Sequence, residues 1–257
     1  MRGWNMKKIV LEKIDELNYN ARESYKALRT NIQFLGSDIK TIAFTSATPN
    51  EGKSTVSFEL ARTMTETGKK ILYVDADIRK SVALVRHGIS EEVVGLSHYL
   101  SGQEKLDNVI YETNIENLHM IFSGQSAPNP SELLGNDLFK ALMAKGREEY
   151  DYVIVDCPPL GSVIDAAIVA QNCDGAIIVI ASDSISYRLE QKIKEQLEKS
   201  GCRILGTIMN KVEVAGKAYG KYYGKYYGKY YGNYGTYGSY GQEELSLIHI
   251  SEPTRRS

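Results

Sequence analysis

The chain has 257 residues, of which 42% are hydrophobic and 25% are charged, and its formal net charge is −1 at pH 7. This length allows one large α/β domain or at most two small ones, and the balanced charge excludes a global attraction to nucleic acid or anionic membrane. The three cysteines are widely spaced without a C-x-x-C pair, which excludes a disulfide framework and a zinc site.

Residues 1–18 form an N-terminal segment of mixed composition. From Tyr19 to Leu35, apolar residues recur every three or four positions, which predicts a helix. Glu23, Lys26 and Arg29 lie one turn apart on its other face. On the residues alone, we expect a solvated face with local ion pairs, and a contact between subunits is the alternative.

Residues 40–55 read K-T-I-A-F-T-S-A-T-P-N-E-G-K-S-T, which predicts a strand, a loop and the first turn of a helix. The ending G-K-S-T is the phosphate-loop signature: glycine lets the backbone approach a phosphate, and the helix N-terminus faces the anion. In such a loop Lys53 reaches the β- and γ-phosphates and Ser54 ligates Mg²⁺. We predict a nucleotide-binding loop formed by Ala47, Thr48, Pro49, Asn50, Glu51, Gly52, Lys53, Ser54 and Thr55.

Two further apolar runs end in aspartate. The first, residues 71–74, leads into Asp75 and Asp77, whose side chains leave an extended chain on the same side. Mg²⁺ would relieve the repulsion between these carboxylates, and helix capping by one of them is the alternative. Arg79 and Lys80 follow, close enough to meet phosphate charge. The second run ends at Asp156, the Walker B position.

The remaining chain continues the alternation of strands and helices. Asn210 ends the last strand and is a candidate for adenine recognition, with a turn asparagine as the equal alternative. Ser131 is expected to be the N-cap of a helix that follows Pro128 and Pro130. Further predicted elements are short helices ending at 102 and covering 106–110, strands at 118–122, 174–181 and 203–209, and helices at 137–149 and 187–200.

This alternation predicts an α/β fold of the P-loop NTPase kind over residues 19–213, with a mostly parallel central sheet and helices on both faces. Right-handed crossovers bring the carboxyl ends of parallel strands to one edge of the sheet. We therefore expect Ser46, Asp75 and Asp156 to lie together there.

The segment 214–241 is rich in tyrosine, glycine and lysine, and from 218 onward it has no large aliphatic residue that could form a core, so we expect it to be disordered. A cationic stacking arm for single-stranded nucleic acid and a set of phosphate acceptors are both consistent with this composition. The tyrosines are Tyr219, Tyr222, Tyr223, Tyr226, Tyr227, Tyr230, Tyr231, Tyr234, Tyr237 and Tyr240.

The two ends of the chain call for separate treatment. Met6 is an alternative start, and residues 242–257 end in a stretch, 245–257, that resembles translated read-through of a sequencing adapter, so we expect no function of this stretch. We expect the native C-terminus at or beyond about Glu244. We expect no signal peptide, and no apolar run approaches the ~20 residues of a membrane span, so we expect a cytoplasmic protein.

Several motifs together resemble the bacterial tyrosine kinases (BY-kinases) of capsule and exopolysaccharide assembly, in their soluble form. T-S-A-T-P-N-E-G-K-S-T is similar to their Walker A motif, I-L-Y-V-D-A-D-I-R to Walker A′ and V-I-V-D-C-P-P to Walker B. A-P-N-P-S-E-L-L and the tyrosine-rich tail also resemble family features. E-S-Y-K-A-L-R is similar to the oligomerisation motif E-x-x-R-x-x-R, with Lys26 replacing an arginine, and Asn50 stands where the family usually has glycine.

The resemblance implies an ATP-dependent protein-tyrosine kinase with Lys53, Asp75, Asp77 and Asp156 as catalytic residues. It implies the cofactors ATP and Mg²⁺, with the metal on Ser54 and the three aspartates. Glu23, Lys26 and Arg29 would form a homo-oligomeric ring in which the tail tyrosines are phosphorylated in trans.

The implied partners are a transmembrane polysaccharide co-polymerase that acts as modulator and recruits the kinase to the inner face of the membrane, and a cognate tyrosine phosphatase. No nucleic acid is expected as a partner. Two alternatives are a partition-type P-loop ATPase switch, which carries a lysine where this chain has Thr48, and a nucleic-acid-binding NTPase that uses the tail.

Overall fold

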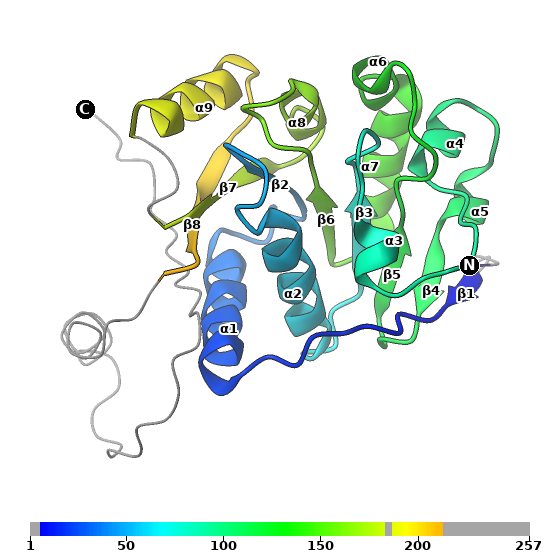
Figure 1. Cartoon of the computed structure of the whole chain (residues 1–257), viewed down its shortest axis with the longest axis horizontal. Coiled ribbons are helices and arrows are strands. Elements are labelled where there is room, and N and C mark those ends of the chain that lie inside the picture. Colours follow the sequence, from blue (N-terminus) through cyan, green and yellow to red (C-terminus); the bar gives the residue numbers. More distant parts are fainter. Residues whose placement is uncertain (1–5, 183–186, 213–257) are drawn as a thin grey trace.

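A computed structural model describes residues 6–182 and 187–212. Its centre is an eight-stranded sheet with the order β1-β4-β5-β3-β6-β2-β7-β8, in which β4 and β5 pair antiparallel and all other neighbours are parallel (Figure 1). The strands are β1 (Lys7–Ile9), β2 (Thr41–Ser46), β3 (Ile71–Asp75), β4 (Tyr111–Thr113), β5 (Leu118–Ile121), β6 (Tyr152–Asp156), β7 (Gly175–Ala181) and β8 (Ile204–Asn210).

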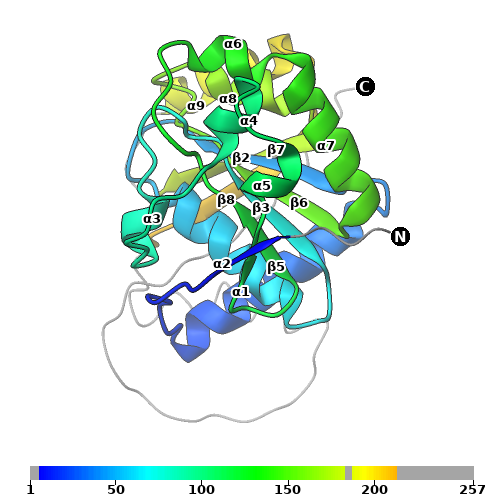
Figure 2. The ribbon, with the colours of Figure 1, turned by 90° about the vertical axis from the view of Figure 1, so that its right-hand side faces the viewer.

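Helices cover both faces of this sheet (Figure 2). The helices are α1 (Tyr19–Phe34), α2 (Lys53–Thr65), α3 (Ala83–Arg86), α4 (Leu96–Leu100), α5 (Leu106–Val109), α6 (Pro130–Leu134), α7 (Asp137–Glu149), α8 (Asp165–Ala170) and α9 (Tyr187–Lys199). Helices α1 and α2 share one hydrophobic core with one face of the sheet, and helices α4 to α9 share a second core with the other face.

The inner strands explain this three-layer arrangement. Strand β2 is buried along its whole length, with Ile42 and Phe44 in the core beneath α1 and α2 and Ala43 in the other. Successive side chains of a strand point to opposite faces, so a continuous apolar run supplies both cores at once. The predicted α/β class and the mostly parallel sheet are thus confirmed.

Some local features differ from the expectations. Ser131 is not an N-cap: α6 begins at Pro130 after Asn129, and the Ser131 hydroxyl donates to Asp165 Oδ1 at 2.7 Å. Proline is favoured at the first helical position because its fixed φ suits the helix, so the helix begins at Pro130 and Ser131 lies inside its first turn. The short strands β1 and β4 and the helices α3 and α8 were not predicted. None of the helices in the described ranges has both the length and the apolar content that a bilayer span requires.

The strand order places three predicted strand ends side by side. Strand β6 lies between β3 and β2, with Asp75 opposite Asp156 and Phe44 opposite Asp156 in the registers of the two pairs. All three strands run in the same direction, so their carboxyl ends meet at one edge, as predicted. The loop between β2 and α2 lies at this edge, next to both aspartates.

Candidate active site

The loop from β2 to α2 has the backbone of an anion-binding turn. Gly52 is the N-cap of α2 with φ of 88°, and no side chain caps the helix, so the first N–H groups of α2 are not used by a cap. Asn50 also has a positive φ, 66°. Asparagine tolerates the left-handed region better than most residues, so Asn50 adopts the conformation for which glycine is the usual choice.

Side chains from neighbouring elements fix this loop. The buried Glu51 carboxylate accepts hydrogen bonds from the Thr48 N–H at 2.7 Å and the Ala181 N–H at 3.4 Å. From the end of β8, the Asn210 amide donates to the Glu51 carbonyl at 3.0 Å, and the Lys211 ammonium donates to the Asn50 carbonyl at 2.9 Å. Glu51 and Asn210 therefore support the loop, and the role of Asn210 in adenine binding stays a prediction.

Lys53 is the first residue of α2, and its side chain points toward the aspartates at the carboxyl edge of the sheet. Its ammonium lies 3.2 Å from Asp156 Oδ1 and donates to the Ser54 hydroxyl at 3.0 Å. Burial lowers the pKa of Lys53, but the charges of Asp156 and Asp77 outweigh this effect, and the net pKa lies above its ordinary value. Lys53 is therefore a firmly charged cation that Ser54 and Asp156 share.

The two Walker A′ carboxylates differ in their surroundings. Asp75 is 2% exposed, accepts a short hydrogen bond from the Ser81 hydroxyl and another from the Asp77 N–H at 3.2 Å. Burial, followed by the charge of Asp156, raises the pKa of Asp75 to about 7. Asp77 is half-buried and accepts the Lys80 N–H at 3.1 Å. The surroundings of Asp75 thus favour its protonated form.

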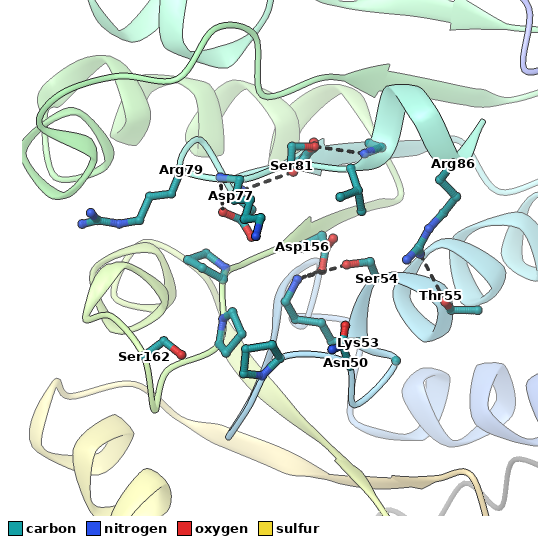
Figure 3. A pocket seen from close by; sticks show the side chains of 18 of the residues that line it. Asn50, Lys53, Ser54, Thr55, Asp77, Arg79, Ser81, Arg86, Asp156 and Ser162 are labelled. Atoms are coloured by element: carbon teal, nitrogen blue, oxygen red, sulfur yellow. Dashed lines mark hydrogen bonds and ion pairs between the residues drawn. The ribbon is translucent and has the colours of Figure 1, made fainter. Parts of the chain in front are cut away.

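These residues line a cavity of about 590 Å³, which lies in the size range of small-molecule sites. Figure 3 shows Lys53, Ser54 and Asp156 pointing toward one another within it. The lining holds five lysine and arginine side chains against three carboxylates, an excess that suits a polyanion such as a nucleotide phosphate chain. The basic residues are Lys53, Arg79, Lys80, Arg86 and Lys211.

Arg79 lies in the cavity wall, but its guanidinium is engaged elsewhere. It forms two hydrogen bonds with Asp165, at 2.6 and 3.0 Å, and a third with the Ser131 hydroxyl at 3.1 Å. In Figure 3 its side chain points away from Lys53 and Asp156. A nucleotide contact by Arg79 stays a prediction, and it would require the guanidinium to leave Asp165.

Sequence reasoning missed several lining residues, among them Ser81, Arg86 and Lys211. Arg86 belongs to α3 and Lys211 follows β8, so neither lies within a recognisable motif. Ser81 lies four residues after Asp77. A hydroxyl residue so close to the acidic pair is a signal that could have marked Ser81 as a site residue.

The proposed interface residues lie on the outer side of α1. Glu23 and Lys26 form an exposed ion pair at 2.7 Å, and the Arg29 guanidinium donates to the Thr63 carbonyl in the last turn of α2 at 2.8 Å. The pair confirms local ion pairing, whereas a contact between subunits stays a prediction. The ten tail tyrosines, Tyr219 to Tyr240, lie outside the described residues.

Comparisons with known proteins agree with these motifs. Residues 39–201 match the family described as AAA domain. The chain is 41% identical to a tyrosine-protein kinase, CpsD, of Streptococcus pneumoniae over 91% of this chain and 98% of that protein. It is 36% identical to the tyrosine-protein kinase YwqD of Bacillus subtilis over 81% of this chain and 88% of that protein.

Solved structures give the same picture of the fold. The kinase domain of the Escherichia coli tyrosine kinase ETK superposes with a TM-score of 0.71 at 33% identity, covering 76% of this chain and 78% of that one. The septum site-determining protein MinD of Pyrococcus horikoshii superposes with a TM-score of 0.59 at 24% identity, covering 71% and 76%. The second likeness shows only that the two chains share a fold.

Proposed function

The chain belongs to the bacterial tyrosine kinase (BY-kinase) family, and from this premise we propose that it transfers the γ-phosphoryl group of ATP to tyrosines of its own C-terminal segment. The acceptors are the ten tyrosines from Tyr219 to Tyr240. The observation that supports this proposal best is the meeting of Lys53, Asp75 and Asp156 at one edge of the sheet. The kinase regulates capsular or exopolysaccharide synthesis and export.

ATP would bind along the loop Ala47–Thr55, with the free N–H groups of α2 facing its phosphates. The donor set suits Mg²⁺, because Ser54 and Asp156 already share one cation, the Lys53 ammonium. Asp75 and Asp77 supply further carboxylates, although no group of three metal-binding side chains is preassembled within the described residues. When bound, the metal supplies positive charge to the phosphates and the leaving group.

In the proposed reaction, residues of the chain stabilise the transferred phosphoryl group and accept the proton of the tyrosine hydroxyl. The tyrosine oxygen bonds to the γ-phosphorus while the bond from this phosphorus to the β,γ-bridging oxygen breaks, and ADP leaves. Lys53 stabilises the phosphate charge throughout. A tyrosine hydroxyl has a pKa near 10, so Asp75 or Asp77 accepts its proton late in a loose transition state. The raised pKa of Asp75 matches this task better, because a base works best with a pKa near the working pH.

The acceptor tail would come from a neighbouring copy in a ring held by Glu23, Lys26 and Arg29. Phosphorylation adds about −1.5 to −2 charge per tyrosine, which would turn a basic tail acidic and favour dissociation of the ring. The partners we propose are a membrane-embedded modulator that activates the kinase and recruits it to the cytoplasmic face of the membrane, and a cognate tyrosine phosphatase.

The alternatives have weaker support. MinD shares the fold at 24% identity, whereas the identity to the tyrosine-protein kinase CpsD of Streptococcus pneumoniae is 41%. One reaction separates the two classes: the protein is incubated with radiolabelled ATP and Mg²⁺, and protein-bound label and free inorganic phosphate are counted together. A kinase retains label on tyrosine, and Asp156→Asn loses it. Release of phosphate with no label on the protein would instead indicate an ATPase switch.

A further inference from the structure

Arg86 is a cation in the active-site cavity that no recognised motif contains. It is the last residue of α3, it is half-buried, and its guanidinium donates to the Thr55 hydroxyl at 3.2 Å. Figure 3 shows it on the Thr55 side of the cavity, across from Arg79. Within residues 6–182 and 187–212, Arg86 makes no ion pair, whereas Arg79 is held by Asp165.

The position of this guanidinium is electrostatically unfavourable unless an anion binds beside it. Thr55 is the third residue of α2, and the N-terminus of a helix carries a partial positive charge that repels cations. A guanidinium stays charged at all accessible pH values and offers five N–H donors, of which this one uses a single donor on a neutral hydroxyl. The cation and the helix terminus together form a site for a phosphate.

The short helix that carries Arg86 is held in place by its neighbours. The next residue, His87, is 4% exposed and lies against the Phe58 ring with a centroid distance of 4.2 Å. The His87 carbonyl accepts the N–H groups of Glu12 and Lys13 at 2.9 and 3.1 Å. Figure 1 shows the segment that carries these two residues running from β1 past α3 to α1.

A second anchor ties α3 to the acidic cluster. The Ser81 hydroxyl donates to Asp75 and accepts the N–H of Ala83, the first residue of α3. The helix that carries Arg86 is therefore fixed at its start by the acidic pair and at its end by the N-terminal segment.

The order of groups along α2 indicates which phosphate Arg86 meets. Lys53 turns toward Asp156, so the β- and γ-phosphates belong on that side. Thr55 lies two residues further along α2, on the side of Arg86. We propose that Arg86, together with Thr55, binds the nucleotide at its α-phosphate, an inference that rests on the ATP binding proposed above.

Titration calorimetry with Mg²⁺·ADP and with a Mg²⁺ complex of a non-hydrolysable ATP analogue tests this inference. Arg86→Ala should weaken the binding of both nucleotides about tenfold, because a hydrogen bond to a charged group is lost from each complex. Arg86→Lys should lie in between, since an ammonium keeps the charge but not the forked geometry. The KM for ATP should rise while kcat stays the same, as expected for uniform binding.

Arg203→Ala serves as the matched control. Arg203 is exposed, precedes β8 at the opposite end of the strands, and does not line the cavity, so its removal should change neither affinity. Thermal unfolding of each variant shows whether the fold is retained. An unchanged affinity for ADP in Arg86→Ala, whether or not the ATP analogue binds more weakly, would overturn the α-phosphate assignment. A wild-type protein that binds neither nucleotide would instead refute the proposed function itself.

Discussion

The Lys53 ammonium lies 3.2 Å from Asp156 Oδ1, so a buried ion pair joins the phosphate loop to the end of β6. The two side chains are only 11% and 7% exposed. The cation that we propose to bind phosphate thus already neutralises a strand-end carboxylate next to Asp75. The ion pair offsets the repulsion among the carboxylates at this edge of the sheet before any nucleotide binds. Removing it should therefore change the free energy of unfolding as well as the activity.

Lys53→Met should lower the free energy of unfolding by about 2–4 kcal/mol at neutral pH, because it leaves Asp156 buried without its partner. Asp156→Asn in the same protein should restore part of this loss. Urea unfolding of the wild type, both single variants and the double variant gives the coupling energy, which we expect to be about 1–3 kcal/mol. Strictly additive losses would show that the ion pair does not stabilise the fold.

Stability should also depend on pH through Asp75. Its pKa rises from an ordinary value of 3.8 to about 7 in the folded protein, so the folded state binds the proton more tightly than the unfolded state. The contribution of Asp75 to stability is therefore most favourable below about pH 4 and falls as the pH rises to about 7.

Asp75→Asn removes this dependence. With a metal chelator present, the variant should match the wild type at about pH 4 and exceed its free energy of unfolding by about 2–4 kcal/mol at pH 8, since one pK unit corresponds to ~1.4 kcal/mol. Urea unfolding over this pH range measures the difference. A difference that does not change with pH would mean that Asp75 titrates as in the unfolded chain.

Gly52→Ala should abolish nucleotide binding. Gly52 has a φ of 88°, and a Cβ there would collide with the Asn210 amide nitrogen that holds the Glu51 carbonyl. The loop must then lose either its conformation or its support from β8. Fluorescence titration with a labelled ADP analogue measures the loss.

Asn50→Gly is the matched variant in the same loop. Asn50 has a φ of 66°, which glycine adopts without strain, so nucleotide affinity should stay within about twofold and stability within about 1 kcal/mol of the wild type. Strong impairment by Asn50→Gly would show that the asparagine side chain, and not only the backbone shape, is needed for binding.

Variants of Arg79 and Asp165 can show whether Arg79 has a structural role or binds the nucleotide. If the pair only ties the β3–α3 connection to α8, then Arg79→Ala and Asp165→Ala should each lower the melting temperature and the double variant should add little more. ADP affinity should then stay close to that of the wild type. A large loss of affinity in Arg79→Ala alone would show that Arg79 leaves Asp165 to bind the nucleotide.

The sequence predicted the elements whose patterns are local. The apolar strands before Asp75 and Asp156 and the helix after Gly52 carry their own periodicity and ending residues. Because parallel strands of such a fold share one carboxyl edge, the meeting of Lys53, Asp75 and Asp156 also followed from the pattern. The phosphate loop and the acidic cluster were therefore predictable before any coordinates.

The parts that were missed depend on contacts between distant segments. Strands β1 and β4 have three residues each, too few to show a period, and they form through pairing: β1 pairs with β4, and β4 also pairs with β5. The pairing of Arg79 with Asp165 was not foreseen, because Asp165 lies 86 positions further along the chain. Arg86 enters the cavity because His87 packs under the N-terminal segment, which no local pattern reveals.

The intact mass of the protein after incubation with ATP and Mg²⁺ tests the central claim most directly. Wild type and Lys53→Met are compared in the presence of the cytoplasmic segment of the proposed modulator, and the modified peptides are then mapped. We predict that the wild type gains several phosphoryl groups, located between Tyr219 and Tyr240. The Lys53→Met variant should gain none. ATP turnover by the wild type with an unmodified tail would contradict a tyrosine kinase that acts on its own C-terminal segment.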